Sequence, residues 1–210
     1  MAKKELNVQI KAPNLQIAEF KIRGTAPFVQ HRFSQKALEM IRAKQAAGDQ
    51  TRKGNPREAK DFDALYLSSM YEGPDGKRGL HAAAFRNGMI SACRICGFKM
   101  TVAKLSVFVI ADCHDIYDHT PMVLFALGEP EKIEDPMRND KGGADIRVRA
   151  MWAPGWEAVL RLRFDADQFS VADVANLLMR VGLQVGVGEG RPDSKKSAGC
   201  GWGTFEIVQG

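Results

Sequence analysis

Six glycines near the C-terminus constrain this chain more than any other feature of its sequence. They stand at positions 186, 188, 190, 199, 201 and 203, in two alternating triplets around a polar, basic stretch. Glycine takes positive φ at no steric cost and lets another part of the chain come close. A helix-period segment (171–181) precedes the stretch and a strand-like run (204–208) follows it. The pattern predicts a glycine loop between a helix and a strand, with Arg191, Lys195 and Lys196 supplying charge that suits a phosphate.

This glycine loop matches neither of the common nucleotide-binding loops. It lacks the four-residue gap and the terminal GK[ST] of a P-loop, and G-x-G-x-x-G is absent. It also follows a helix, whereas those loops open one. The alternative interpretation is a flexible turn with a solvated lysine pair, because glycine-rich turns are common.

Composition favours a folded protein with an anionic partner. The chain has 210 residues, of which 45% are hydrophobic, so a sizeable core is expected and general disorder is not. The net charge is +5 and the pI is near 9.1. Residues 21–60 hold ten basic against three acidic side chains, whereas 110–145 hold nine acidic against three basic. This asymmetry predicts one lobe built for an anion and another kept away from it.

The ends and the cysteines indicate a cytoplasmic protein with no membrane partner. The N-terminus is polar, with no apolar segment of a signal peptide after it, and no apolar run is long enough to span a membrane. Four cysteines in a chain of this size do not indicate a disulfide scaffold.

Hydrophobic periodicity predicts an α+β fold. Alternation indicates strands over 16–23, 104–111, 122–127, 146–152, 156–164 and 204–208. Helices are expected over 35–47, 80–96 and 171–181, a short amphipathic segment over 61–71 and a polar loop over 129–143. A ferredoxin-like βαββαβ core fits this order if the middle is an insertion. We therefore expect one domain (1–210) with a basic helical insertion around 34–78 and an acidic insertion around 112–145.

Four stretches, taken in order, resemble a known family. They are GTAPFVQHR at 24–32, LHAAAFRNG at 80–88, the hairpin and helix over 156–178, and GVGEGRP with GCGWG at 186–192 and 199–203. Together they resemble the RAMP superfamily, the repeat-associated RNA-binding proteins of CRISPR systems. The resemblance is greatest to the backbone subunit that coats CRISPR RNA and to its phage-borne relatives. Asn87 stands where that family has a glycine, and Glu189 and Asp193 add acidic residues to the loop.

The resemblance implies a modified RRM-like core that binds single-stranded nucleic acid, often as a head-to-tail homo-oligomer, with no cofactor. RRM-type sheets bind through base stacking and backbone contacts. The expected nucleic-acid contacts are Arg23, His31, Arg32, Lys36, Arg52, Lys53, Arg57, Arg86, Gly188, Gly190, Arg191, Lys195, Lys196, Gly199 and Gly201. The alternative for the charged residues is a solvated surface.

A metal site is not expected. Cys93-x-x-Cys96 resembles half a zinc site, which Cys113, His114 and His119 would complete. The two cysteines lie in a helical pattern among alanine and isoleucine, so we expect them on the core face of a helix. We also expect Trp152 and Trp156 to pack at a hairpin, and Trp202 and Phe205 to serve packing more than base stacking.

The sequence predicts a non-enzymatic protein that coats RNA or DNA as an oligomer. No nucleophile elbow, HExxH motif or paired-carboxylate pattern is present. Two alternatives stay open. One is an endoribonuclease of the same fold that uses His31. The other is a phage protein that mimics a CRISPR subunit and engages a CRISPR effector complex as a protein-interaction module.

Overall fold

Two long antiparallel strands form the centre of the fold. The computed structural model describes residues 10–32, 39, 60–138, 144–194 and 199–208. β1 (Leu15–Gly24) pairs with β10 (Glu157–Asp165) along its whole length, from Leu15 opposite Asp165 to Arg23 opposite Glu157. Alternate side chains of a strand point to one face. On the face towards the core, five apolar residues of the two strands are fully buried: Ile22, Ala158, Leu160, Leu162 and Phe164. The strands predicted over 16–23 and 156–164 are confirmed.

Further strands extend this pair on both sides. β11 (Phe205–Val208) pairs with β1, and β5 (Val107–Ile110) pairs with β10, which gives the antiparallel order β11-β1-β10-β5. β7 (Pro121–Leu127) pairs with the other end of β10. β4 (Arg78–His81), β3 (Tyr71–Glu72) and β6 (Cys113–His114) continue the sheet from β7 and β4.

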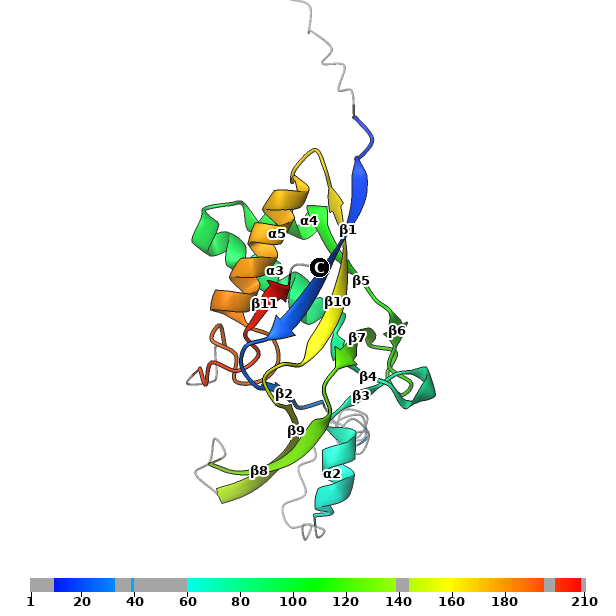
Figure 1. Ribbon diagram of the computed structural model, residues 1–210, viewed down its shortest axis with the longest axis vertical. Coiled ribbons are helices and arrows are strands. Elements are labelled where there is room, and N and C mark those ends of the chain that lie inside the picture. The colour runs from blue at the N-terminus through cyan, green and yellow to red at the C-terminus, as the bar shows by residue number, and fades with distance from the viewer. Residues whose placement is uncertain (1–9, 33–38, 40–59, 139–143, 195–198, 209–210) are drawn as a thin grey trace, which may run out of the picture.

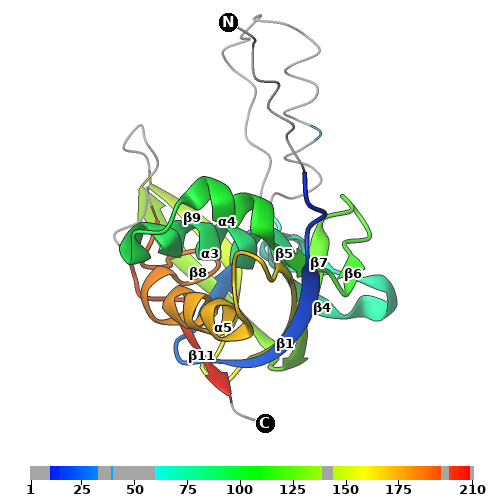
Figure 2. The same ribbon diagram turned by 90° about the horizontal axis from the view of Figure 1, so that it is seen from above.

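Helices cover one face of this sheet, as Figures 1 and 2 show. α3 (Ala82–Cys96) ends at Gly97, which has a φ of 66°, and α4 (Met100–Ser106) follows it. α5 (Val171–Arg180) starts with a reciprocal capping box between Ser170 and Asp173 and runs on into a π-helical turn, η2 (Val181–Val185). In chain order, β1, α3, β5, β10, α5 and β11 follow the pattern βαββαβ.

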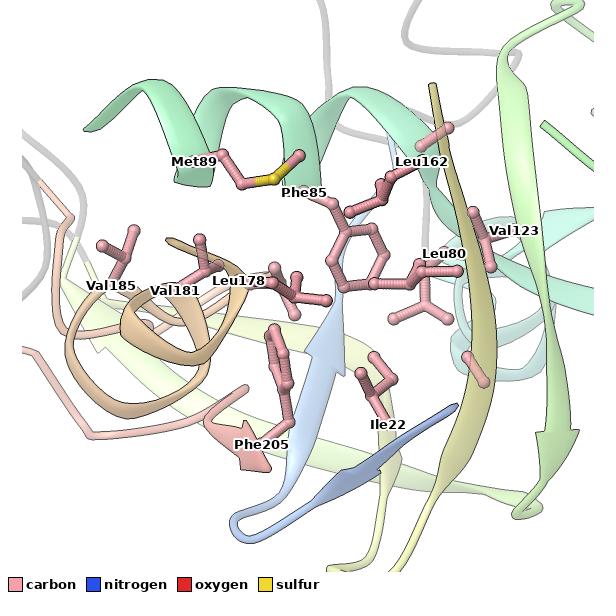
Figure 3. Packing of buried hydrophobic residues seen from close by; sticks show 14 of the residues in the cluster. Ile22, Leu80, Phe85, Met89, Val123, Leu162, Leu178, Val181, Val185 and Phe205 are labelled. Atoms are coloured by element: carbon pink, nitrogen blue, oxygen red, sulfur yellow. The ribbon is translucent and has the colours of Figure 1, made fainter. Parts of the chain in front are cut away.

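The core lies between α3, α5 and the sheet. Figure 3 shows Phe85 and Met89 of α3 pointing towards side chains from α5, η2 and the strands. Gly88 lies where α3 crosses η2, and a Cβ atom there would come within 2.7 Å of Val181 Cγ1. The small residues of α3 therefore serve internal packing: Ala82, Gly88 and Ala92 are buried.

A second, three-stranded sheet has the order β2-β9-β8. β2 (Phe28–Gln30) pairs with β9 (Ala144–Trp152), which pairs with β8 (Pro130–Arg138). In Figure 1, α2 (Phe62–Ser68), capped by Asp61, lies beside β9. The ring of Phe28 joins the two sheets, with its centroid 5.5 Å from that of Trp152 and 5.6 Å from that of Trp156.

Three sequence predictions of secondary structure are wrong in part. The polar loop expected over 129–143 is a strand as far as 138. β8 is an edge strand, and proline is tolerated there because its missing N–H can face solvent instead of a partner strand. The strand expected over 104–111 is helical as far as Ser106, and Leu105 is 78% exposed. The predicted helix over 80–96 begins two residues later, after β4.

Two further expectations concern the helix after β2 and a membrane span. The helix expected over 35–47 lies outside the described residues. None of the helices in the described ranges is long and apolar enough to cross a membrane.

Candidate functional site

The glycine loop has the backbone conformation that its sequence predicts. All six glycines have positive φ, between 68° at Gly203 and 80° at Gly188. The two triplets lie against each other: Val187 N donates to Gly203 O at 3.0 Å, and Trp202 N donates to Gly190 O at 3.3 Å. Within the described parts of the loop, 186–194 and 199–203, the two triplets therefore hold each other by backbone hydrogen bonds.

The same loop is docked on β2 and on the turn before it. Gly203 N donates to Pro27 O at 2.7 Å, and Glu189 N donates to Val29 O at 2.9 Å. A Cβ atom on Gly188 would lie 2.5 Å from the Phe28 ring. Glycines that we expected to let a phosphate backbone come close thus let β2 and the turn before it come close. Of the six, Gly201 is the one whose Cβ position has no atom within 4 Å.

Two clefts meet at this loop. The first has a volume of about 320 Å³ and lies between β2, the β3–β4 hairpin and the loop. The second, of about 650 Å³, lies between α3 and the loop. Both are lined by Ala84, Val187, Gly188 and Arg191. Arg191 therefore stands at the junction of a cleft that continues from β2 along α3.

Arg191 is the predicted cation that the structure places best for an anion. Its Nη1 donates to Gly188 O at 3.1 Å, which anchors the guanidinium on the loop. No carboxylate in the described ranges lies within salt-bridge distance of it. An anchored guanidinium with further N–H donors suits a phosphate oxygen.

Two histidines line the first cleft, together with Tyr71. The ring of His81, which precedes α3, lies 5.8 Å from that of Tyr71. Burial lowers the pKa of both His31 and His81 below the usual value for histidine. Glu189 partly opposes this effect at His31. Both rings are therefore mainly neutral near pH 7 and offer one donor and one acceptor each.

A cluster of charges forms the wall behind the loop. Glu189 Oε1 lies 2.9 Å from Arg149 Nη1 and 3.7 Å from Arg147 Nη1 in two ion pairs. Its Oε2 lies 3.8 Å from His31 Nδ1. The guanidinium of Arg149 also lies 5.9 Å from the Trp202 ring centroid. Glu189, read in the sequence only as an acidic departure from the family, is thus the centre of an electrostatic cluster.

Arg32, expected to contact phosphate, is buried instead. Its side chain is 3% exposed, and its Nη2 lies 2.8 Å from Asp115 and 3.3 Å from Asp118. The guanidinium lies over Tyr117, 5.0 Å from the ring centroid. In this arrangement a phosphate cannot reach Arg32, which acts as an anchor between the end of β2 and the turn after β6.

Other predicted contacts lie away from the cleft. Arg86 donates from Nε to Val107 O at 3.1 Å and links α3 to β5. Arg23, with Lys21, binds Glu157 on the sheet face opposite the helices, and these two cations lower the pKa of that carboxyl. Lys36, Arg52, Lys53, Arg57, Lys195 and Lys196 lie outside the described residues.

The cysteines and tryptophans divide between core and surface. Cys93 is buried as expected, but Cys96 is exposed, because it lies on the last turn of α3, beyond the core. Within the described ranges, no group of three or more side chains could hold a metal ion. Trp152, Trp156 and Phe205 are buried, which confirms their packing role, whereas Trp202 is half-buried.

Sequence reasoning missed much of the cleft. Its lining includes Tyr71 and His81, and Arg147 and Arg149 stand behind it. Alternation over 146–152 puts both arginines on the same face of that strand. Nothing in the local pattern indicated that this face meets the glycine loop, because that contact joins segments about forty residues apart.

Comparisons with known proteins give a likeness of fold. No family model and no curated protein matches this sequence. The chain is similar to one in the cryo-EM structure of the Type III-B Cmr-beta bound to cognate target RNA, with a TM-score of 0.54 and 10% sequence identity. The match covers 93% of this chain and 60% of that chain, so this chain spans about three fifths of the other's length. At this identity the match shows a shared α+β fold with antiparallel sheets.

Proposed function

We propose that this protein binds single-stranded RNA or DNA without cleaving it, as a RAMP-type subunit that coats the strand as an oligomer. The observation that carries the proposal is the continuous cleft between the glycine loop, α3 and β2, with Arg191 at its junction. The similar chain comes from a structure that contains target RNA, which supports a nucleic acid as the occupant.

The order of the elements supports a ferredoxin-like, RRM-type core. The pattern βαββαβ with strand order β11-β1-β10-β5 is that of the ferredoxin-like fold, which RRM domains share. RRM domains stack bases on aromatic side chains of the sheet. The outward side chains of β1 and β10, both fully described, include no aromatic ring. The aromatic ring of β5, Phe108, lies under the guanidinium groups of Arg86 and Arg163, each 5.2 Å from its centroid.

The cations of this sheet face are also largely neutralised. Lys21 and Arg23 bind Glu157, and Arg161 binds Asp112 at 2.9 Å. No open aromatic ring therefore favours the sheet over the cleft, and of the cations on the outward face of β10, Arg163 is the one without a carboxylate within salt-bridge distance in the described ranges. In the cleft, Arg191 would contact phosphate, and the rings of Tyr71 and His81 would stack on bases.

Oligomer formation rests on the family resemblance alone. Ala82, Gly88 and Ala92 of α3 pack inside the chain and give no support to a subunit contact. Light scattering with long single strands should show assemblies larger than one protein. Strictly monomeric protein on saturated strands would overturn this part of the proposal.

Fluorescence anisotropy with labelled single strands of RNA and DNA tests the proposal. Arg191→Ala should weaken binding to all sequences to a similar extent. It should also reduce the slope of the logarithm of the binding constant against the logarithm of the salt concentration by about 0.7, the contribution of one phosphate contact on a single strand. Lys77→Ala is the matched control, because Lys77 is exposed at the tip of the β3–β4 hairpin. Equal binding by both variants and the parent would remove the cleft from consideration.

One observation favours a second function, RNA cleavage. His31 and His81 line the same cleft, and two neutral histidines can serve as general base and, after protonation, as general acid. Incubation of RNA with the protein and with His31→Ala separates the two functions. Our proposal expects intact RNA in both samples. Cleavage that disappears in the variant would establish the second function.

A further inference from the structure

The carboxylate of Glu189 lies where three basic side chains converge. Arg149, Arg147 and His31 approach it at 2.9, 3.7 and 3.8 Å. The arginines come from β9 and the histidine from the end of β2, so separate segments are brought together around one anion. Glu189 and His31 also line the first cleft, which places this anion at the wall of the candidate interface.

Two polar atoms of this cluster have no hydrogen-bond partner among the described residues. The Arg149 side chain is 4% exposed, and its Nη1 and Nη2 bind Glu189 and Asp135. Its Nε is buried without a hydrogen-bond partner, and so is Glu189 Oε2. Buried polar atoms without partners are uncommon and costly in folded proteins, and each one calls for an explanation.

We propose that Arg149, Arg147 and His31 form a phosphate-binding site that Glu189 occupies when no nucleic acid is bound. The ligand is a phosphodiester group of the bound single strand, so this inference rests on the proposed function. A phosphodiester carries one negative charge shared by two non-bridging oxygens in a tetrahedral arrangement, and its ester oxygens also accept. It can therefore engage donors that the planar carboxylate leaves unpaired.

The loop geometry allows this exchange without unfolding the loop. Glu189 N remains bound to Val29 O at 2.9 Å, and the flanking glycines at 188 and 190 keep their positive φ. The Glu189 side chain is 27% exposed and lines the first cleft, so in this proposal it rotates into the cleft and moves its carboxylate away from the arginines. Arg191, two residues along, then contacts a neighbouring phosphate. Glu189 thus competes with the strand and limits its affinity.

The test compares Glu189→Gln with the parent protein by anisotropy, with polyuridylate and polythymidylate as probes. Glutamine keeps the shape and removes the competing charge, so affinity should rise about 3- to 10-fold. The slope of the logarithm of the binding constant against the logarithm of the salt concentration should stay the same, because the parent and the variant hold the same phosphates once the strand is bound. Asp167→Asn, an exposed carboxylate paired with Lys11, changes net charge equally and should leave both values unchanged.

Arg147→Gln provides an independent measurement in the opposite direction. Its side chain is 40% exposed, so the variant should fold even if Glu189→Gln does not. It should weaken binding and flatten the salt dependence by about 0.7. Parental binding that neither variant changes would overturn this inference and leave the proposed function intact. Absence of binding by the parent and both variants would overturn both.

Discussion

Replacing Gly203 by alanine should open the glycine loop, and replacing Gly201 should not. Both residues have nearly the same φ, 68° and 73°, so alanine suffers the same backbone strain at either position. They differ in their surroundings. The new Cβ atom at 203 would lie 1.7 Å from Val187 O, whereas at 201 nothing lies within 4 Å.

The expected magnitudes follow from these contacts. Left-handed backbone costs an alanine about 1–2 kcal/mol, which is the whole effect expected at 201. At 203 the clash must also separate the chains, and it weakens the hydrogen bonds of Gly203 with Val187 (3.0 Å) and Pro27 (2.7 Å). Each is worth about 1 kcal/mol, so Gly203→Ala should cost about 3–4 kcal/mol in total.

Urea unfolding of the two variants measures this difference. The free energy of unfolding should fall by about 2 kcal/mol more for Gly203→Ala than for Gly201→Ala. Nucleic-acid binding at low temperature should also fall more for Gly203→Ala, because the loop carries Arg191. Equal destabilisation by the two substitutions would refute the conclusion that the glycines serve close approach between the two halves of the loop.

Further predictions concern the Arg32 anchor, the pKa of His31 and the metal content. Arg32→Met leaves Asp115 charged in the interior and should lower the free energy of unfolding by about 3–5 kcal/mol; a loss below about 1 kcal/mol would contradict the anchoring role. Burial lowers the pKa of His31 in the folded protein, so the unfolded chain binds a proton at a higher pH than the folded protein does. The free energy of unfolding should therefore fall as pH drops from about 6.5 through the folded pKa. Unfolding measured against pH should show this loss, and a histidine that titrates above 6.5 by NMR would contradict it. In Glu189→Gln the pKa of His31 should fall further, because the carboxylate raises it. Elemental analysis should find no stoichiometric zinc; one zinc per chain would overturn that expectation.

The sequence predicts the elements whose side-chain pattern matches their backbone period. β10 alternates without interruption, and α5 carries both a capping box and an apolar stripe, so both are found with nearly correct ends. The sequence did not predict β8, because an edge strand tolerates proline and acidic residues and its composition is not set by packing. The alternation of Leu105 with Val107 and Val109 crosses a helix–strand boundary, and a pattern this short fits both periods.

The candidate site was less predictable because tertiary contacts create it. The glycine spacing indicated the loop and Arg191, and both lie at the cleft. The charge of Arg32 suggested an open phosphate contact, but Asp115 and Asp118, more than eighty residues away in the chain, bury it. Likewise, the local sequence around Glu189 gives no sign that Arg149 will reach it.

Photo-crosslinking tests most directly whether single strands lie in the cleft. Single-stranded RNA that carries 4-thiouridine is bound, irradiated and digested, and the attached peptides are identified by mass spectrometry. The cleft predicts crosslinks at Tyr71, at His81 and in the glycine loop between Val187 and Arg191, all reduced in Arg191→Ala. Crosslinks confined to the open face of β1 and β10, or an equal yield in Arg191→Ala, would contradict the central claim.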